Sequence, residues 1–247
     1  MANMIYTVAV NHDKSQYQHS DFAKYSIKTW KYWCEKNGVD FICVTEHDDK
    51  YGYPIWNKLN VVDICKDYDK VGIVDCDTMI KWDAPNIFDE VTDGVYGVLD
   101  QGNLRWIADS VRTRKHFFNH TMDLEKYINA GVVFLDKKSL SVYKHLQEFY
   151  FEHQEELDNW TKGGGKEQTL FNYHLQHLNY KVNVIPPIWN LVSMHKTEMF
   201  SHNWQDGEDK TPFFIKYGYV YHFTGFEIEK RFELMDKTWE MTKVNYE

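Results

Sequence analysis

The chain has 247 residues, of which 43% are hydrophobic and 17% aromatic, enough for one α/β domain with a large core. Its formal net charge is −9 and it has no basic run, which argues against nucleic acid and anionic lipid as partners. No segment approaches 18 apolar residues and the N-terminus lacks the pattern of a secretion signal, so we expect a cytoplasmic protein without a membrane span. The four cysteines form no CxxC pair, which favours small buried thiols over a zinc site.

Apolar runs and helical patterns alternate along the first hundred residues. The first helix is expected to end at Asn37-Gly38, because glycine commonly follows the last helical turn. The β-α-β-α-β order predicts a parallel, Rossmann-like half. The expected strands are 4–10, 41–44 and 70–74, and the expected helices are 21–36 and 56–65.

The rest of the chain continues with strands and helices. Segment 103–123 is polar and predicts either a helix or a mobile loop, and Gly163-Gly164-Gly165 predicts a hinge or a tight turn. No linker or internal repeat divides the chain, so we expect one domain with fused halves at about 1–100 and about 101–247. The remaining expected strands are 94–99, 128–135, 182–185 and 217–223, and the remaining helices are 139–156, 166–178 and one at the C-terminus.

Two carboxylates one residue apart, Asp75 and Asp77, follow the apolar run 71–74. In α/β sheets, ligands bind at the carboxyl ends of strands, so both acids are expected at a ligand site. Their oxygens suit Mg²⁺ or Mn²⁺ carrying a diphosphate. The alternative is a pair of solvated acids, since Asp-x-Asp is common in loops, but the strand in front of the pair favours a metal site.

Further residues suit such a site, although each also has a plain structural explanation. His222 ends the last expected strand and adds an imidazole that Mn²⁺ accepts, whereas a lone histidine there is more often structural. Asn129 is suited to hydrogen-bond sugar hydroxyls or simply to start a strand. Glu167 opens a helix, where an acid is favourable in any case, or lies at the mouth of a pocket. Lys58 alone would be a solvated lysine.

Together these segments resemble the family 8 glycosyltransferases, the group that includes glycogenin and bacterial lipopolysaccharide sugar transferases. The resemblance covers roughly residues 4–225. It implies a single GT-A domain, in which a Rossmann-like nucleotide-sugar half with a mixed central sheet is fused to a smaller acceptor-binding half. The motifs that carry it are Trp56-Asn57-Lys58-Leu59, Asp75-Cys76-Asp77, Asn129-Ala130-Gly131, Lys166-Glu167-Gln168 and His222-Phe223-Thr224-Gly225.

The resemblance implies transfer of a sugar from a nucleoside diphosphate sugar to a hydroxyl of a glycan, a lipid-linked glycan or a protein, with retention of configuration. We expect a hexosyl- or pentosyltransferase that depends on Mn²⁺ or Mg²⁺ and uses a UDP-sugar as donor. An ion held by fixed carboxylates would stabilise the charge that grows on the leaving diphosphate. The implied metal ligands are Asp75, Asp77 and His222, the residues implied in transfer are Glu167, Gln168 and Asp100, and the implied donor-binding residues are Lys58, Ala9, Asn11, Asn129, Ala130, Gly131, Gly225 and Lys230.

The chain departs from the family in three places, and one of them is the end of the first strand, Ala9-Val10-Asn11, which is only loosely similar to the family's base-binding segment. The family's Lys-Pro-Trp, whose lysine grips the diphosphate, is replaced by Phe226-Glu227-Ile228-Glu229-Lys230, and the acid at residue 167 is Glu where the family has Asp. The positive charge at the phosphates is therefore expected from Lys58 first and from Lys230 second, or else from the basic stretch 112–115.

Three other functions are open alternatives. A catalytically weak or inactive nucleotide-sugar-binding protein would bind a donor without turnover, and the missing Lys-Pro-Trp favours it. A haloacid dehalogenase-type phosphatase also ends a strand in Asp-x-Asp, but Thr78 lies one place too early for its motif, and two strand-helix units precede the pair. A sugar nucleotidyltransferase requires a glycine-rich basic segment after the first strand, which residues 12–16 do not supply.

Overall fold

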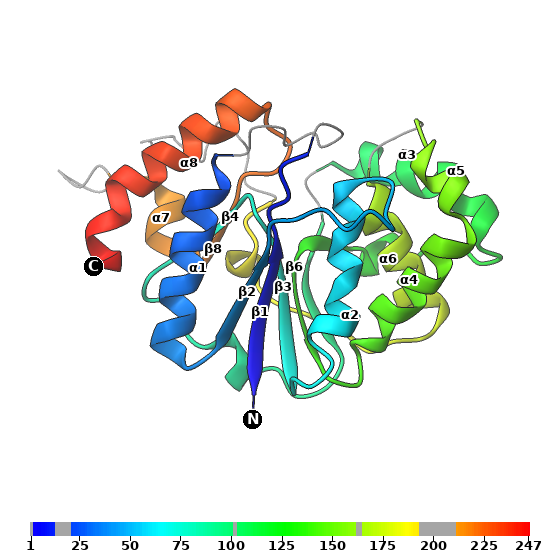
Figure 1. Ribbon diagram of the computed structural model, residues 1–247, viewed down its shortest axis with the longest axis horizontal. Coiled ribbons are helices and arrows are strands. Elements are labelled where there is room, and N and C mark those ends of the chain that lie inside the picture. Colours follow the sequence, from blue (N-terminus) through cyan, green and yellow to red (C-terminus); the bar gives the residue numbers. More distant parts are fainter. Residues whose placement is uncertain (1, 13–20, 101–102, 162–164, 193–210) are drawn as a thin grey trace.

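The computed structural model describes residues 2–12, 21–100, 103–161, 165–192 and 211–247. The central strands are β1 (Asn3–Val8), β2 (Asp40–Val44), β3 (Lys70–Asp75), β5 (Val95–Leu99), β6 (Ile128–Asp136) and β7 (Val182–Val184). They form one sheet with the order β2-β1-β3-β6-β5-β7 (Figure 1). β1 is parallel to β2 and β3, whereas β6 is antiparallel to β3 and β5. The sheet is therefore mixed, as expected, and its first three strands confirm the parallel half.

Helices cover both faces of this sheet. The helices are α1 (Ala23–Asn37), α2 (Val61–Ile64), α3 (Leu104–Arg114), α4 (Ser141–Glu152), α5 (Gln154–Asp158), α6 (Lys166–His177), α7 (Phe213–Tyr217) and α8 (Ile228–Thr242). In Figure 1, α1 and α8 lie on one side of the sheet, and α2, α4 and α6 lie on the other. Strands buried on both faces need nearly continuous apolar sequence, which explains the runs in β1 and β3.

Helix ends follow local chemistry. α1 ends where Gly38 adopts a left-handed conformation with φ of 64°. The helix expected at 56–65 is instead a 3₁₀ helix, η1 (Pro54–Asn60), followed by the single turn of α2. The helix expected at 139–156 is divided into α4 and α5 at His153. A helix or a mobile loop was expected at 103–123, and the structure has a helix there, since α3 occupies the first half of the segment.

A second, two-stranded sheet continues the Asp-x-Asp segment. β4 (Thr78–Ile80) pairs antiparallel with β8 (Val220–His222), and Thr78 lies opposite His222. β4 was not expected, since three residues carry no recognisable strand pattern. The strand expected at 217–223 was too long at its start, because its first residue ends α7. The pairing brings the C-terminal histidine beside the acidic pair.

Other expectations concern the thiols and the glycine hinge. All four cysteines are free, three of them are buried, and Cys43 is partly exposed. Residues 163 and 164 of the expected hinge lie outside the described residues, whereas Gly165 has a φ of 68° at the start of α6. Within the described ranges, no helix combines the length and the apolar character that a membrane crossing needs.

Candidate functional site

The three expected metal ligands come together at the carboxyl end of β3. One ligand atom each from Asp75, Asp77 and His222 lies within 4.8 Å of the others, and His222 Nε2 is 3.3 Å from Asp77 Oδ1. Asp75 is the last residue of β3, and the β4–β8 pairing supplies His222. Gly131 on β6 faces the same space, because a Cβ there would collide with His222 and come within 2.7 Å of Asp75 Oδ2. Two carboxylates and one imidazole suit Mn²⁺ or Mg²⁺, so the donor set fits the ion that the sequence implies.

Lys58 lies behind Asp75 and is almost fully buried. Its Nζ is 2.7 Å from Asp75 Oδ1 and 3.4 Å from Glu167 Oε2, and it donates to the carbonyl oxygen of Ala130 at 3.3 Å. Burial alone would lower the pKa of Lys58, but the two carboxylates hold it well above its usual value. The ammonium is therefore charged and bound to the site's own acids, whereas a solvated lysine was the simple alternative.

Glu167, at the start of α6, is also deeply buried beside the ligands, with a side chain only 4% exposed. Burial raises its pKa, Lys58 opposes that rise, and Asp75 adds to it. Its second oxygen, Oε1, has no hydrogen-bond partner among the residues that the structure describes, and neither has the buried hydroxyl of Tyr143. A buried carboxylate oxygen without a donor is costly, so this atom marks a place where a ligand hydroxyl would be favourable.

Asp77 is buried beneath α8. Arg231 Nε lies 3.5 Å from Asp77 Oδ2 and also donates to the carbonyl oxygen of Phe223 at 3.0 Å. Burial would raise the pKa of Asp77, but Arg231 and then His222 outweigh this effect. The pKa of Asp77 therefore lies well below its usual range. Arg231 was not expected from the sequence. The sequence feature that could have indicated its burial is the helical spacing, which puts Arg231 on the same face of α8 as Leu234 and Met235.

The expected sugar-binding residues form one hydrogen-bonded group. Asp100 Oδ2 accepts from Gln168 Nε2 at 2.9 Å and from Asn129 Nδ2 at 3.2 Å. Gln168 Oε1 accepts from the backbone N–H of Ala130 at 3.0 Å, which fixes the orientation of its amide. The structure therefore brings together Asp100, Asn129 and Gln168, which lie far apart in sequence.

This group continues to the metal ligands through Asn190, a second residue that the sequence analysis missed. Asn129 Oδ1 accepts from the backbone N–H of Gly131 at 2.9 Å, so its amide orientation is settled by an obligatory donor. The same oxygen accepts from Asn190 Nδ2 at 3.0 Å, which turns Asn190 Oδ1 toward His222 Nδ1 at 2.8 Å. An amide oxygen only accepts, so His222 carries its proton on Nδ1 and presents Nε2 to Asp77 and the ion position.

The other expected donor-binding residues lie on further segments, of which the end of β1 is next to Asp75, since Val8 lies opposite it. Ala9 and Asn11 follow β1, and the backbone N–H of Ala9 donates to Val44 O at 2.8 Å. Gly225 has a φ of 70°, which favours glycine. Lys230 is half exposed and pairs with Glu233 at 3.0 Å. In the basic stretch 112–115, Arg112 is exposed and pairs with Asp109, while Arg114 is buried beside Trp160.

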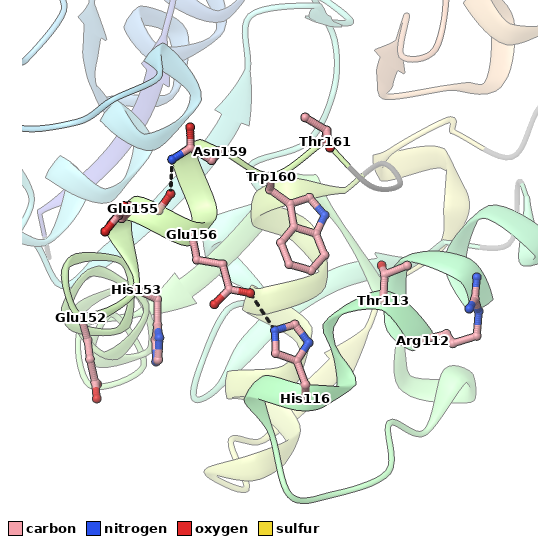
Figure 2. A pocket seen from close by; sticks show the side chains of 10 residues that line it. All are labelled: Arg112, Thr113, His116, Glu152, His153, Glu155, Glu156, Asn159, Trp160 and Thr161. Atoms are coloured by element: carbon pink, nitrogen blue, oxygen red, sulfur yellow. Dashed lines mark hydrogen bonds and ion pairs between the residues drawn. The ribbon is translucent and has the colours of Figure 1, made fainter.

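A cavity of about 850 Å³ lies between α3 and the α4–α5 pair (Figure 2). His116 and Trp160 stack there with ring centroids 5.7 Å apart, and His116 Nε2 lies 2.9 Å from Glu156 Oε1. Arg112 and Thr113 of the basic stretch line it, but none of the implied metal ligands, transfer residues or donor-binding residues does.

No protein-family model and no curated protein sequence matches the chain. Solved structures do: a glycosyltransferase involved in glycosylation of the major capsid protein of PBCV-1 has a TM-score of 0.59 and 12% identity over 96% of this chain and 100% of that one. The bifunctional glycosyltransferase WbbM has a TM-score of 0.53 and 14% identity over 97% of this chain and 50% of that one. The galactosyltransferase LgtC has a TM-score of 0.49 and 13% identity over 97% and 99%. At these identities the likeness concerns the fold, and the chain has the α/β fold of GT-A glycosyltransferases.

Proposed function

We propose that the protein is a metal-dependent glycosyltransferase that moves a sugar from a nucleoside diphosphate sugar to a hydroxyl of a carbohydrate or glycoconjugate. The observation that carries this proposal is the convergence of Asp75, Asp77 and His222 at the carboxyl end of β3, in a fold shared with glycosyltransferases. That edge of the sheet is where α/β proteins bind nucleotides.

The chain's own residues have distinct roles in this proposal. Asp75, Asp77 and His222 hold the ion, which when bound stabilises negative charge on the departing diphosphate. Asn129, Gln168 and Asp100 form a rigid polar surface for sugar hydroxyls, because each is fixed by at least one of the others. The hydrogen bonds among these side chains leave little reorganisation for the reaction itself.

Glu167 is the proposed acid facing the donor sugar, and its unpartnered Oε1 supports that role. A contact that strengthens as the glycosidic bond breaks raises turnover without tightening the binding of the nucleotide. Glu167→Gln should therefore reduce turnover much more than affinity for the nucleoside diphosphate. An equal loss of both would make Glu167 a scaffold residue.

The finer proposals are a UDP-sugar donor, Mn²⁺ in preference to Mg²⁺, transfer of a hexosyl or pentosyl group, and retention of configuration at the anomeric carbon. They come from the resemblance to family 8. A panel of nucleotide sugars with Mn²⁺ or Mg²⁺, read by thermal shift and by release of nucleoside diphosphate, tests them. Asp75→Asn is the control, since it removes one ligand charge from a partly exposed side chain.

A nucleotide-sugar-binding protein without turnover is the second candidate. The observation that favours it is the Lys58–Glu167 ion pair, which already occupies the acid proposed to face the sugar. The same panel separates the two functions, because this candidate gives thermal shifts with a donor and ion but releases no nucleoside diphosphate with any acceptor.

A further inference from the structure

Both polar atoms of the Gln168 amide have partners within the protein. Its Oε1 accepts from the backbone N–H of Ala130 at 3.0 Å, and its Nε2 donates to Asp100 Oδ2 at 2.9 Å and to the hydroxyl oxygen of Tyr127 at 3.4 Å. The two hydrogens of the amide nitrogen therefore have one acceptor each. What Gln168 can offer to a sugar hydroxyl is the second lone pair of Oε1, and its direction depends on the residues that hold Nε2.

Tyr127, the residue before β6, holds both Gln168 and Asp100. Its hydroxyl oxygen accepts from Gln168, and its carbonyl oxygen accepts from the backbone N–H of Asp100 at 2.9 Å. The Tyr127 side chain is fully buried, so its ring has little freedom to move. Burial also raises the pKa of Tyr127 to about 12, so the hydroxyl keeps its proton at neutral pH. One buried residue thus fixes two members of the sugar-binding group, which consists of Asp100, Asn129 and Gln168.

The proton of the Tyr127 hydroxyl points to Thr169, the residue after Gln168 on α6. The hydroxyl oxygens of Tyr127 and Thr169 are 2.8 Å apart. Among the described residues, Gln168 and Thr169 are the side-chain partners of the Tyr127 hydroxyl. Since the Tyr127 oxygen accepts from Gln168, its own proton goes to Thr169 Oγ1. This direction leaves a lone pair of Tyr127 for the amide of Gln168.

Thr169 also connects this arrangement to α3. Its Oγ1 lies 2.6 Å from Ser110 Oγ, which accepts from Nη1 of the buried Arg114 at 2.9 Å. A Cβ at Gly165 would come within 2.9 Å of Thr169 Oγ1 and 3.0 Å of Ser110 Oγ, so the start of α6 packs closely on α3. The chain of hydroxyl groups therefore ties the helix turn that carries Gln168 to α3 as well as to the start of β6.

We propose that Tyr127 is a positioning residue that sets the Gln168 amide and Asp100 for recognition of the donor sugar, and that Thr169 acts through it. This inference rests on the proposed function. A hydrogen bond weakens steeply when its distance or angle is wrong, so the groups that orient a sugar-binding side chain affect affinity for the sugar. Because the Tyr127 hydroxyl bonds to Gln168 and Thr169, its loss should weaken binding of the sugar part of a donor and spare the diphosphate part.

Binding of a nucleotide sugar and of its nucleoside diphosphate to the whole protein tests the proposal without any transfer. The probe is the compound that gives the largest thermal shift with Mn²⁺ among UDP-glucose, UDP-galactose, UDP-N-acetylglucosamine and GDP-mannose, and its diphosphate is measured beside it. Calorimetry gives both dissociation constants for each variant. We expect Tyr127→Phe to bind the nucleotide sugar about five- to tenfold more weakly and the diphosphate within about twofold of the wild type.

Tyr173→Phe is the matched control. It removes another buried tyrosine hydroxyl, which donates to the carbonyl oxygen of Val111 on α3 at 3.2 Å. Both substitutions should lower the melting temperature, but Tyr173→Phe should leave both dissociation constants unchanged. Thr169→Val removes the acceptor of the Tyr127 proton and should reproduce part of the loss. Thr169→Ser keeps a hydroxyl there and should restore the affinity for the nucleotide sugar.

A Tyr127→Phe protein that loses affinity for the nucleotide sugar and the diphosphate by the same factor overturns the inference, and so does a loss that Tyr173→Phe shares. If Tyr127→Phe does not fold, the Thr169 variants decide, because equal affinity of Thr169→Val and Thr169→Ser for the nucleotide sugar also overturns it. Absence of binding by every nucleotide sugar and diphosphate contradicts both this inference and the proposed function. The expected ratios without release of diphosphate to any acceptor contradict the proposed function alone.

Discussion

The two aspartates are separated by one residue but lie in different surroundings. On the side of Asp75, which we call the open side, the Asp75 side chain is 34% exposed, and Lys58 contacts both Asp75 and Glu167. On the side of Asp77, which we call the closed side, the Asp77 carboxylate is only 3% exposed and contacts Arg231 and His222 beneath α8. The open side has more acids than cations, whereas the closed side holds a single acid between a fixed cation and a fixed imidazole.

This difference separates two tasks that one metal site has to perform. The Asp77 side supplies a ligand whose position does not change, because its partners are anchored to backbone carbonyls and to Asn190. The Asp75 side supplies a ligand, Asp75, and an acid, Glu167, which share Lys58. Each of the two carboxylates can therefore leave Lys58 for a substrate while the other stays paired with it. We therefore expect substitutions on the closed side to affect stability first and substitutions on the open side to affect binding and turnover first.

Removing the closed-side charge should have the largest effect. Asp77→Asn removes the buried negative charge that contacts Arg231 and His222, and the loss of one partner of a buried ion pair should lower the free energy of unfolding by about 3–5 kcal/mol. Asp75→Asn should cost less than half as much, because Asp75 is partly exposed and Lys58 keeps Glu167. Urea unfolding at neutral pH measures both, and equal losses would contradict the distinction between the two sides.

Lys58 tests the open side. Lys58→Ala should weaken binding of a nucleotide-sugar donor with Mn²⁺ by roughly ten- to a hundredfold, because it removes a charge-assisted contact that orients Asp75. Lys230→Ala should do less, since its ammonium is half exposed and pairs with Glu233. Calorimetric titration decides the ranking. Unchanged affinity in Lys58→Ala with a large loss in Lys230→Ala would reverse it.

Acid should weaken the helix that carries Glu167. Burial lowers the pKa of His174 on α6, a hydrogen bond with the carbonyl oxygen of Leu170 opposes this, and the nearby His145, His177 and His120 add to it, so that the pKa falls from its ordinary value of 6.5 to about 4. Between about pH 6.5 and pH 4, His174 is protonated in the unfolded chain and neutral in the folded chain. The free energy of unfolding therefore falls as the pH drops from about 6.5 toward 4. The loss between pH 7 and pH 5 should be about 2 kcal/mol.

His174→Gln should flatten this part of the pH profile, measured by urea unfolding at each pH. The substitution of an exposed histidine, His145→Gln, is the control and should leave most of the slope. A slope that is unchanged in His174→Gln would place the acid-sensitive group elsewhere.

The smallest expected effect concerns the link between the sugar-binding group and the ligands. Asn190→Leu breaks the hydrogen bonds to His222 and Asn129 without a change in charge, so Mn²⁺ affinity in the presence of UDP should fall about tenfold. Asn172→Leu is a matched control, because this buried asparagine bonds to the backbone of Ile128 and Gln168. It should lower stability and leave Mn²⁺ affinity unchanged.

Local patterns were enough to predict the six strands of the central sheet and to place Asp75, Asp77 and His222 at strand ends, where the structure brings them together. The apolar run before Asp75 and the run before His222 each mark a buried strand, and a buried strand directs the residue at its end to the sheet edge. The partners of these residues could not be predicted in the same way. Arg231 is an ordinary charged helix residue until α8 packs over Asp77, and β4 exists only because β8 pairs with it.

Two signals were nevertheless present in the sequence. Asn190 is a polar residue inside the apolar run 188–192, and a buried amide in such a place needs partners. Arg231 shares its helix face with Leu234 and Met235. The burial of Lys58 left no such trace, because a lysine beside Trp56 and Leu59 in a short 3₁₀ helix looks the same whether its ammonium is solvated or not.

The pairing of β4 with β8 determines when the site can come into existence. More than half of the chain separates Asp77 from His222 and Arg231, so these contacts close a very long loop, and contacts of that kind form late in folding. During synthesis the two aspartates leave the ribosome well before their histidine and arginine. The growing chain therefore carries the acidic pair without its histidine and arginine partners until β8 and α8 have been made.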